Sequence, residues 1–469
     1  MKLLKRVLLV LVVLSILFVL VFVLVVGPWP TYAESDFEHA GFYTDALHAI
    51  DQAAQESHFT HAPGQLLAGW ASKSITPAVS QPLAGYSARP GDKHSIGVRE
   101  QVEVRVLALG DGEDRVVLVG ADMLIIPPNV AEHVRRQAAN RCGLSPSNIL
   151  LNASHTHCGP GGFAPGWAAE FSAGPYEETM PAFLAGSFVD AIEEACDALE
   201  PARLAAGDVD APQFIRNRAR KEGPVDPELN FLRIEQQDGE KCYLVSYNAH
   251  PTTFGDDMMR FSGEYPGELV RYIERTENAA AVYLGGAVGS MGPNAPEGPD
   301  AESRVVAMGE ALAKLVLEHT RALPLQDKFD IASVGVPLGM PPMQMRPFEG
   351  NTNWRVSPLL GRVLGLPGEG WLQGVRVGNI LFVGLPCDFS GEISREWKTW
   401  ARDQKCDLWP LSFNGAYCGY FSPDKYYLET PLGYETGLMS WYGPNIEAYF
   451  TALFHHLFKA LELPKESAA

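Results

Sequence analysis

The sequence predicts an α/β protein with a large mixed β-sheet core flanked by helices, an αββα-like sandwich, preceded by one N-terminal transmembrane helix. Three observations support this prediction. Short strand-like segments alternate along the chain with longer segments of helical periodicity. An uncharged apolar run of bilayer length begins at residue 7. The overall composition of the 469 residues, 46% hydrophobic and 20% charged, is that of an ordinary globular chain.

The amino terminus contains the predicted transmembrane segment. Residues 7–26 are apolar except for Ser15, and a helix of this length spans about 30 Å, the thickness of a bilayer core. A cleaved signal peptide has a shorter apolar region, of about 7–15 residues, so an uncleaved anchor is favoured over a signal. The basic residues in 1–6 place this leader in the cytoplasm and the rest of the chain on the extracytoplasmic side. Cleavage would instead give a secreted protein.

The remaining chain divides into a connector over residues 27–64, with helical spacing at 43–50, and one domain of catalytic size over 65–465. No Ser/Gly-rich or Pro-rich linker and no short repeat interrupts this domain. Strands are predicted at 102–109, 116–122, 148–153, 243–249, 280–285, 330–337 and 379–384. Helices are predicted at 128–141, 183–199, 302–319 and 446–462, where apolar residues recur at helical spacing.

Charge and cysteine content exclude several classes of protein. The formal net charge of −19 argues against a nucleic-acid surface, because phosphate binding needs clustered Lys and Arg. The seven cysteines are scattered singly without a CxxC pair, so neither a cysteine zinc module nor a disulfide-dense scaffold is predicted.

Histidines that follow predicted strands indicate a metal site. His155 and His157 come directly after a short strand, in SHTHCGPGG, and in extended backbone side chains two apart point to the same side. Paired imidazoles suit zinc, although an isolated pair of this kind is equally typical of ordinary loop histidines. His250, in YNAHPTT, also follows an apolar strand and favours the metal interpretation.

Further polar groups follow other predicted strands. Asp388, in LPCDFS, offers a carboxylate, or alternatively caps a helix that begins near Ser390. Tyr417, Tyr420 and Tyr434 supply phenols, which alone indicate little. The chain has neither a P-loop nor a G-x-S-x-G elbow, which disfavours nucleotide binding and an α/β-hydrolase.

These segments together resemble a known family. SHTHCGPGG, NAHPTT, FSGEYPG, GSMGPN, LPCDFS and AYCGYFSP occur in the order found in the catalytic domain of neutral/alkaline non-lysosomal ceramidases, and the resemblance runs from about Ser74 to Pro444. The family is a group of zinc amidohydrolases that cleave N-acylsphingosine to a fatty acid and sphingosine. The resemblance implies Zn²⁺ as cofactor, a lipid or N-acyl amide as substrate, and the following residues. His155, His250, Asp388 and Tyr420 are the implied zinc ligands, and His157, Arg218, Tyr434 and Ser290 the implied catalytic residues.

The implied mechanism is attack of a metal-activated water on the amide carbonyl. His157 would face the substrate amide and is expected to protonate the leaving amine, while Tyr434, Arg218 or His157 would hold the developing oxyanion. A membrane anchor suits a lipid substrate, because the lipid then never has to enter water.

The sequence also departs from the family pattern. Asp388 stands where the family has Glu, and Glu392 is an alternative ligand. The family's active-site serine aligns with Gly292, so either Ser290 takes its place or no serine is needed. The residues after 442 do not match the accessory β-sandwich domain of long ceramidases. Two alternatives therefore stay open: a zinc hydrolase of another amide or ester, and a non-catalytic lipid-binding relative.

Overall fold

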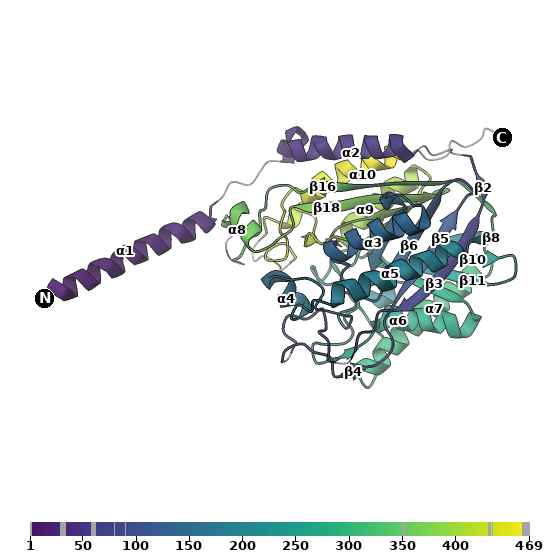
Figure 1. The fold of residues 1–469 in the computed structure, drawn as a ribbon, viewed down its shortest axis with the longest axis horizontal. Helices are drawn as coiled ribbons and strands as arrows, with labels where there is room; N and C mark the ends of the chain where they lie inside the picture. Colours follow the sequence, from purple (N-terminus) through teal and green to yellow (C-terminus); the bar gives the residue numbers. More distant parts are fainter. Residues whose placement is uncertain are drawn as a thin grey trace.

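The computed structural model describes residues 2–28, 34–57, 62–78, 80–89, 91–348, 350, 353–429, 433 and 435–461. Figure 1 shows a layered α/β body from which one long helix projects.

A mixed eight-stranded sheet forms the larger of two central layers. Its strands are β3 (Leu67–Ser74), β5 (Glu103–Gly110), β6 (Arg115–Ala121), β7 (Ile149–Ala153), β8 (Glu200–Asp210), β10 (Glu228–Gln236), β11 (Lys241–Tyr247) and β13 (Ala280–Gly285). They are ordered β13-β11-β10-β8-β3-β5-β6-β7. The inner pairs are antiparallel, whereas β11 with β13 and β6 with β7 form a parallel pair at each edge.

The eight-stranded sheet curls until its edge strands, β7 and β13, meet. The side-chain amide of Asn152 in β7 donates to the carbonyl of Gly285 (3.0 Å), and its oxygen accepts from the Gly285 N–H (2.6 Å). Glycine is needed at this seam, because a Cβ on Gly285 would lie 2.5 Å from the carbonyl oxygen of Ala153. Since Tyr247 pairs with Gly285 across β11 and β13, the carboxyl ends of all three strands meet at one place.

A four-stranded sheet packs on one face of the first. Its strands are β16 (Ile331–Gly339), β18 (Glu369–Val377), β19 (Ile380–Gly384) and β21 (Asp407–Leu411), in the order β16-β18-β19-β21. An apolar core fills the space between the sheets, with Phe382 and Trp409 facing Leu118 and Leu232. Asn152 also donates to the carbonyl of Ser412 (2.7 Å), directly after β21, so the second sheet reaches the same seam.

Helices cover the outer face of each sheet. The eight-stranded sheet packs against α3 (Pro128–Cys142), α5 (Met180–Asp197), α6 (Glu264–Glu277) and α7 (Ala301–Thr320). The four-stranded sheet packs against α2 (Gly41–Ser57), α9 (Gly391–Asp403) and α10 (Ile446–Ala460). Figure 1 shows α2 and α10 above β16 and β18, and α5, α6 and α7 on the opposite side. The αββα-like sandwich predicted from the sequence is confirmed.

Shorter elements lie in the loops. They are β1 (Val26–Gly27), β2 (Gly64–Gln65), β4 (Gly97–Val98), β9 (Ile215–Asn217), β12 (Arg260–Phe261), β14 (Met291–Pro293), β15 (Lys328–Phe329), β17 (Arg355–Val356), β20 (Asp388–Phe389), β22 (Tyr420–Phe421), α4 (Trp167–Ala173), α8 (Pro358–Val363) and the 3₁₀ helices Glu34–His39, Pro146–Asn148, Pro212–Phe214 and Asp424–Tyr426.

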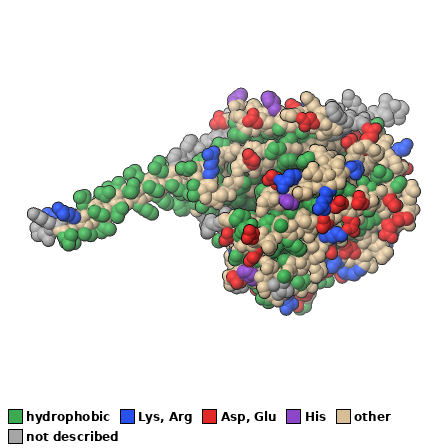
Figure 2. Space-filling view, in the orientation of Figure 1, with side chains coloured by type: hydrophobic (Ala, Val, Ile, Leu, Met, Phe, Trp, Pro, Cys, Tyr) green, Lys and Arg blue, Asp and Glu red, His purple; other side chains and the backbone are tan. Residues whose placement is uncertain are grey.

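The N-terminal helix α1 (Lys2–Val25) projects from the body, which it contacts through its last turn. Its segment Leu3–Val25 has a mean hydropathy of 3.6, and hydrophobic side chains cover it along its length (Figure 2). A long apolar helix near the N-terminus is typical of a membrane anchor and also of a signal sequence.

All of the predicted strands and helices occur in the structure, with ends shifted by a few residues. The helix expected at 43–50 is longer, because α2 continues to Ser57 along the apolar edge of the second sheet. Not predicted were β3, β8, β10, β18, β21 and α6. The last begins with Glu264-Tyr-Pro-Gly, and Pro and Gly in a first turn look like a loop in the sequence.

Candidate metal centre and active site

His155 and His157 lie in the loop that leaves β7 at the sheet seam. Their ring centroids are 5.1 Å apart, with the ring planes nearly perpendicular. His155 has φ of +67°, in the left-handed region, so the loop is not extended as the sequence analysis assumed. The two rings therefore converge because the chain turns at His155, not because an extended strand aims both to one side.

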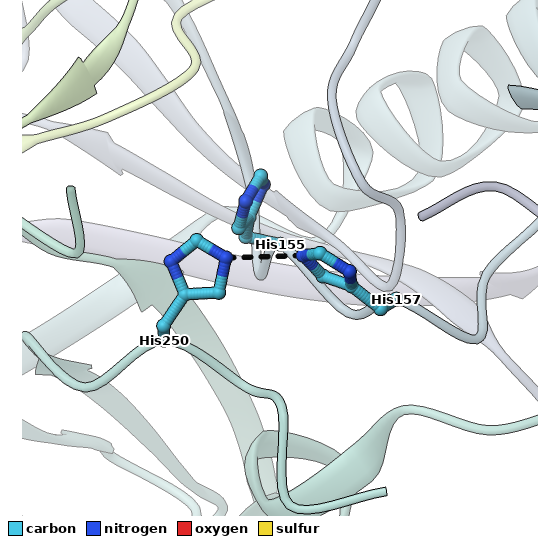
Figure 3. A group of neighbouring side chains, drawn as sticks. All are labelled: His155, His157 and His250. Atoms are coloured by element: carbon cyan, nitrogen blue, oxygen red, sulfur yellow. Dashed lines mark hydrogen bonds between the residues drawn. The ribbon is translucent and has the colours of Figure 1, made fainter. Parts of the chain in front are cut away.

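His250 joins this pair from the loop after β11. Its Nε2 lies 3.0 Å from Nε2 of His157, and its ring centroid lies 4.3 Å from that of His155. Nitrogen atoms of all three rings lie within 4.8 Å of one another, and Figure 3 shows the rings facing a common point.

Backbone carbonyls orient two of these rings. Nδ1 of His155 lies 2.6 Å from the carbonyl oxygen of Leu124, and Nδ1 of His250 lies 3.4 Å from that of Val288. A ring nitrogen facing a carbonyl must carry the proton, which leaves Nε2 with a lone pair. Both Nε2 atoms are then suited to bind a cation.

Asp388 brings a carboxylate to the histidines from the segment that follows β19 of the four-stranded sheet. It lies in β20, directly opposite Tyr420 in the parallel partner strand β22. Its Oδ1 is 3.4 Å from Nε2 of His155 and 3.9 Å from Nδ1 of His250. Its Oδ2 accepts a hydrogen bond of 2.7 Å from the phenol of Tyr417. His155, His250 and Asp388 thus lie close together, and Tyr420 is the cross-strand neighbour of Asp388; that these four bind a metal stays a prediction.

The alternative reading of Asp388 as a helix cap is wrong. The N-cap of α9 is Ser390, whose Oγ accepts from the backbone N–H of Glu392 (3.2 Å). The Glu392 carboxylate binds elsewhere, with Oε1 accepting from Asn217 (2.9 Å) and Oε2 from Tyr426 (2.8 Å). Asp388, and not Glu392, is therefore the carboxylate beside His155 and His250.

Burial sets the protonation of the cluster. Desolvation lowers the pKa of His155 to about 3 and holds the pKa of His157 and His250 well below the usual value for imidazole. Desolvation also raises the pKa of Asp388 to about 7, against the opposing effect of the Tyr417 hydrogen bond. The three imidazoles are consequently neutral at pH 7, the form in which histidine binds metals.

Arg218 supplies a positive charge beside this centre. Its Nη2 donates to the phenol oxygen of Tyr420 and to the carbonyl of Gly289, each at 2.9 Å. Its Nε lies 3.7 Å from Oε1 of Glu435. Predicted residue Tyr434 lies outside the described residues.

Ser290 lies near Arg218, but its hydroxyl faces the start of α9. Its Oγ is 3.0 Å from Oγ of Ser390 and accepts from the N–H of Gly391 (3.1 Å). Gly292 lies in β14, and a Cβ there would approach the Arg218 side chain at 3.5 Å, an ordinary contact. A catalytic role for Ser290 stays a prediction.

The chemistry of this donor set fits a zinc ion. The buried Oδ1 of Asp388 has no hydrogen-bond partner, nor does Nδ1 of His157. A buried acceptor left without a donor costs stability, whereas a cation at this point would satisfy the carboxylate and the imidazole lone pairs together. Two or three imidazoles and one carboxylate are ligands that zinc prefers.

Several contacts of the site had no clear signal in the sequence. Phe413 stacks on His155 with centroids 4.1 Å apart and planes 6° from parallel. Tyr86 packs on His157 at 4.7 Å, and Arg89 donates to the His157 backbone carbonyl. Tyr86 belongs to a segment that resembles the family, whereas Phe413 belongs to none of the motifs and lies three residues before AYCGYFSP.

Comparison with known proteins identifies what this arrangement resembles. Residues 66–294 match the family described as neutral/alkaline non-lysosomal ceramidase, N-terminal. Over these residues the chain is similar to the neutral ceramidases. Neutral ceramidase of Mycobacterium tuberculosis is 26% identical over 44% of this chain and 34% of its own length. Neutral ceramidase of Pseudomonas aeruginosa is 23% identical over 82% of this chain and 71% of its own length.

Solved ceramidase structures share the fold. The crystal structure of neutral ceramidase from Pseudomonas aeruginosa matches with a TM-score of 0.70 and 20% identity, covering 86% of this chain and 76% of that one. A ceramidase complexed with C2 matches with a TM-score of 0.71 and 19% identity, covering 86% and 77%. The alignment to the mycobacterial ceramidase spans only about a third of that protein. The family match includes His155 and His250 but ends before Asp388 and Tyr420.

Proposed function

We propose that this protein is a zinc-dependent amidohydrolase that cleaves the amide bond of an N-acyl lipid, N-acylsphingosine in the first instance, to a fatty acid and an amine. The observation that carries the proposal is the convergence of His155, His157 and His250 at the seam of the sheets, with the carboxylate of Asp388 beside His155 and His250. Relatives named neutral ceramidases support the choice of substrate.

The residues proposed to hold the metal are His155, His250, Asp388 and Tyr420. Nε2 of His155 and Oδ1 of Asp388 are already 3.4 Å apart, and Tyr420 is the cross-strand partner of Asp388. When bound, the metal would polarise the amide carbonyl and make a water molecule acidic enough to attack at neutral pH. Asp388 is one methylene shorter than the family's glutamate, and its position in β20 compensates by placing it directly beside the histidines.

His157 is proposed as the group that moves the proton. It is less buried than His155 and His250, and its Nδ1 has no partner in the structure. Because its pKa is low, the imidazole is neutral at rest and accepts a proton from the attacking water. It then donates that proton to the nitrogen of the departing amine, which balances the reaction.

Arg218 is proposed to stabilise the negative charge that develops on the carbonyl oxygen. Its guanidinium is held in place by Gly289, Tyr420 and Glu435, so little reorganisation is needed when the charge appears. Tyr434, next to Glu435 in the sequence, is the second proposed donor to this oxyanion.

The proposed location is a membrane surface. α1 is proposed as an uncleaved anchor, with residues 65–465 as a catalytic domain on the extracytoplasmic side. The three basic residues before the apolar run support this orientation, because positive charge is retained on the cytoplasmic side.

A substrate panel tests the proposal. Purified full-length protein in mixed micelles is assayed against N-acylsphingosine, N-acyl amino acids and acyl esters, with His157→Ala as the inactive control. Release of fatty acid from N-acylsphingosine that is lost in His157→Ala supports the proposal. Hydrolysis of only the other substrates would identify a different hydrolase, and binding of N-acylsphingosine without turnover would identify the lipid-binding alternative that Gly292 suggests.

A further inference from the structure

The end of α1 is built into the folded body. Val26 and Gly27 form β1, which pairs antiparallel with Val356 and Arg355 of β17. The N–H of Ser357 donates to the carbonyl of Val25 (2.8 Å), and Val26 is buried. The apolar helix therefore leaves the body from a fixed strand pair.

A small apolar cluster surrounds this junction. Val26, Met345 and Val356 form its buried centre, and the partly buried side chains packed on it are Val25, Met343, Trp354, Leu360, Leu366 and Trp441. Phe22 of α1 reaches the same cluster, with its ring centroid 6.0 Å from that of Trp354. The cluster connects the last turn of α1 to helix α8, which begins directly after β17, and Figure 1 shows α8 at the end of the body nearest α1.

The outer face of α8 is apolar and uncovered. Leu359 and Val363 lie one helical turn apart, on the same face, and are 72% and 75% exposed. Among the described residues after Gly27, only two other large apolar side chains exceed 70% exposure. Phe348, 42% exposed, extends this face beside Trp354 at a ring distance of 6.5 Å. We call Phe348, Leu359 and Val363 the α8 patch.

We propose that the α8 patch is a bilayer-contact surface that inserts into the membrane interface beside the outer end of α1. Continuity with α1, the proposed membrane anchor, favours a bilayer as the partner of the patch. The last turn of α1 packs in the same apolar cluster as Trp354 and Leu360, which adjoin the patch. Exposed Arg362 lies between Leu359 and Val363 on α8, where a guanidinium can reach lipid phosphates while the apolar side chains enter the acyl region.

The same cluster leads from the membrane to the candidate active site. Trp441 packs against Tyr417 at a ring distance of 5.4 Å, and Tyr417 donates to Asp388. Insertion of the α8 patch would therefore hold the side of the candidate site that contains Trp441 and Tyr417 close to the bilayer. This second step rests on the proposed function, since it matters only if the substrate is a lipid.

Lipid contact is tested on the full-length chain in nanodiscs. In a Cys142→Ser background, which removes the only cysteine that is not buried, Leu359→Cys, Val363→Cys and the control Ile96→Cys each carry an NBD label. Ile96 is 71% exposed and belongs to the body, away from α8. Blue-shifted emission, quenched at least twofold by doxyl lipids, is expected at 359 and 363 but not at 96.

Two results would overturn the proposal. Labels at 359 and 363 as exposed to water as the label at 96 would show that no surface covers the patch. Blue-shifted labels that doxyl lipids do not quench would show that protein, such as a second copy of the chain, covers it.

The catalytic consequence is tested separately. Leu359→Asn with Val363→Asn should lower hydrolysis of N-acylsphingosine in bilayers about tenfold and change hydrolysis in detergent micelles less than twofold. Equal losses in both would contradict the link to substrate access. Absence of all hydrolysis in the unmodified protein would instead contradict the proposed function, and the labelling result would stand.

Discussion

Replacing Asp388 by Asn should stabilise the metal-free protein at alkaline pH while abolishing tight metal binding. The native pKa of this carboxyl is raised to about 7 from its ordinary value of 3.8, chiefly by desolvation. A group with a raised native pKa contributes its full stability below pH 4 and loses it as pH rises through 7. At pH 8 a shift of this size corresponds to about 4 kcal/mol, at about 1.36 kcal/mol per pH unit. Asparagine avoids this cost because it carries no charge.

The assay is thermal unfolding of wild-type protein and Asp388→Asn after chelation, at pH 5 and pH 8, in the same detergent. The pKa of other acids, Glu264 and Glu447 among them, is also raised to about 7, so the quantity compared is the difference in melting temperature between the two proteins at each pH. We expect the metal-free variant to have the higher melting temperature at pH 8, and the two melting temperatures to be closer at pH 5. With zinc present the wild-type protein should have the higher melting temperature, because only the carboxylate binds the cation. A metal-free variant that is less stable than wild type at pH 8 would refute the reasoning.

The other predictions concern the neighbouring residues. His155→Ala should lose the metal, measured as zinc per chain after dialysis. His157→Ala should retain the metal yet hydrolyse N-acylsphingosine about 10²–10⁴-fold more slowly; loss of metal here would show that His157 is a ligand. Arg218→Met should retain the metal and lower kcat by about 10²–10³, the range for removal of one oxyanion donor, and an unchanged kcat would exclude that role. Gly292→Ser should fold with an unchanged melting temperature, because its Cβ has room beside Arg218; if the serine contributes to catalysis, kcat rises.

The sequence predicts the layers of this protein well, because continuous apolar segments such as 116–122 and 280–285 have few alternatives to buried strands. It predicts β8 and β10 poorly. In β8 only Ala202, Leu204 and Ala205 are buried, and charged side chains occupy exposed positions, so neither strict alternation nor a continuous apolar run appears. Helix α6 is hidden by Pro266 and Gly267 in its first turn.

The candidate site also contains features that the sequence predicts and features that depend on tertiary packing. His155 and His250 follow apolar strands, and the curl of the sheet that brings β7 to β13 unites them, although nothing local in the sequence specifies that curl. Asp388 lies in β20, shortly after β19 of the four-stranded sheet, so its distance to His155 depends on how the two large sheets pack. The stacking of Phe413 on His155 rests entirely on tertiary structure.

Metal content and metal-dependent turnover, measured on one preparation, test the central claim most directly. The full-length protein is purified without added metal, its zinc is determined by mass spectrometry, and fatty acid release from N-acylsphingosine is followed before chelation, after chelation and after zinc is restored. We predict about one zinc per chain, loss of turnover on chelation and recovery on re-addition, with neither zinc nor turnover in His155→Ala. A metal-free preparation that hydrolyses the amide at full rate would contradict the account.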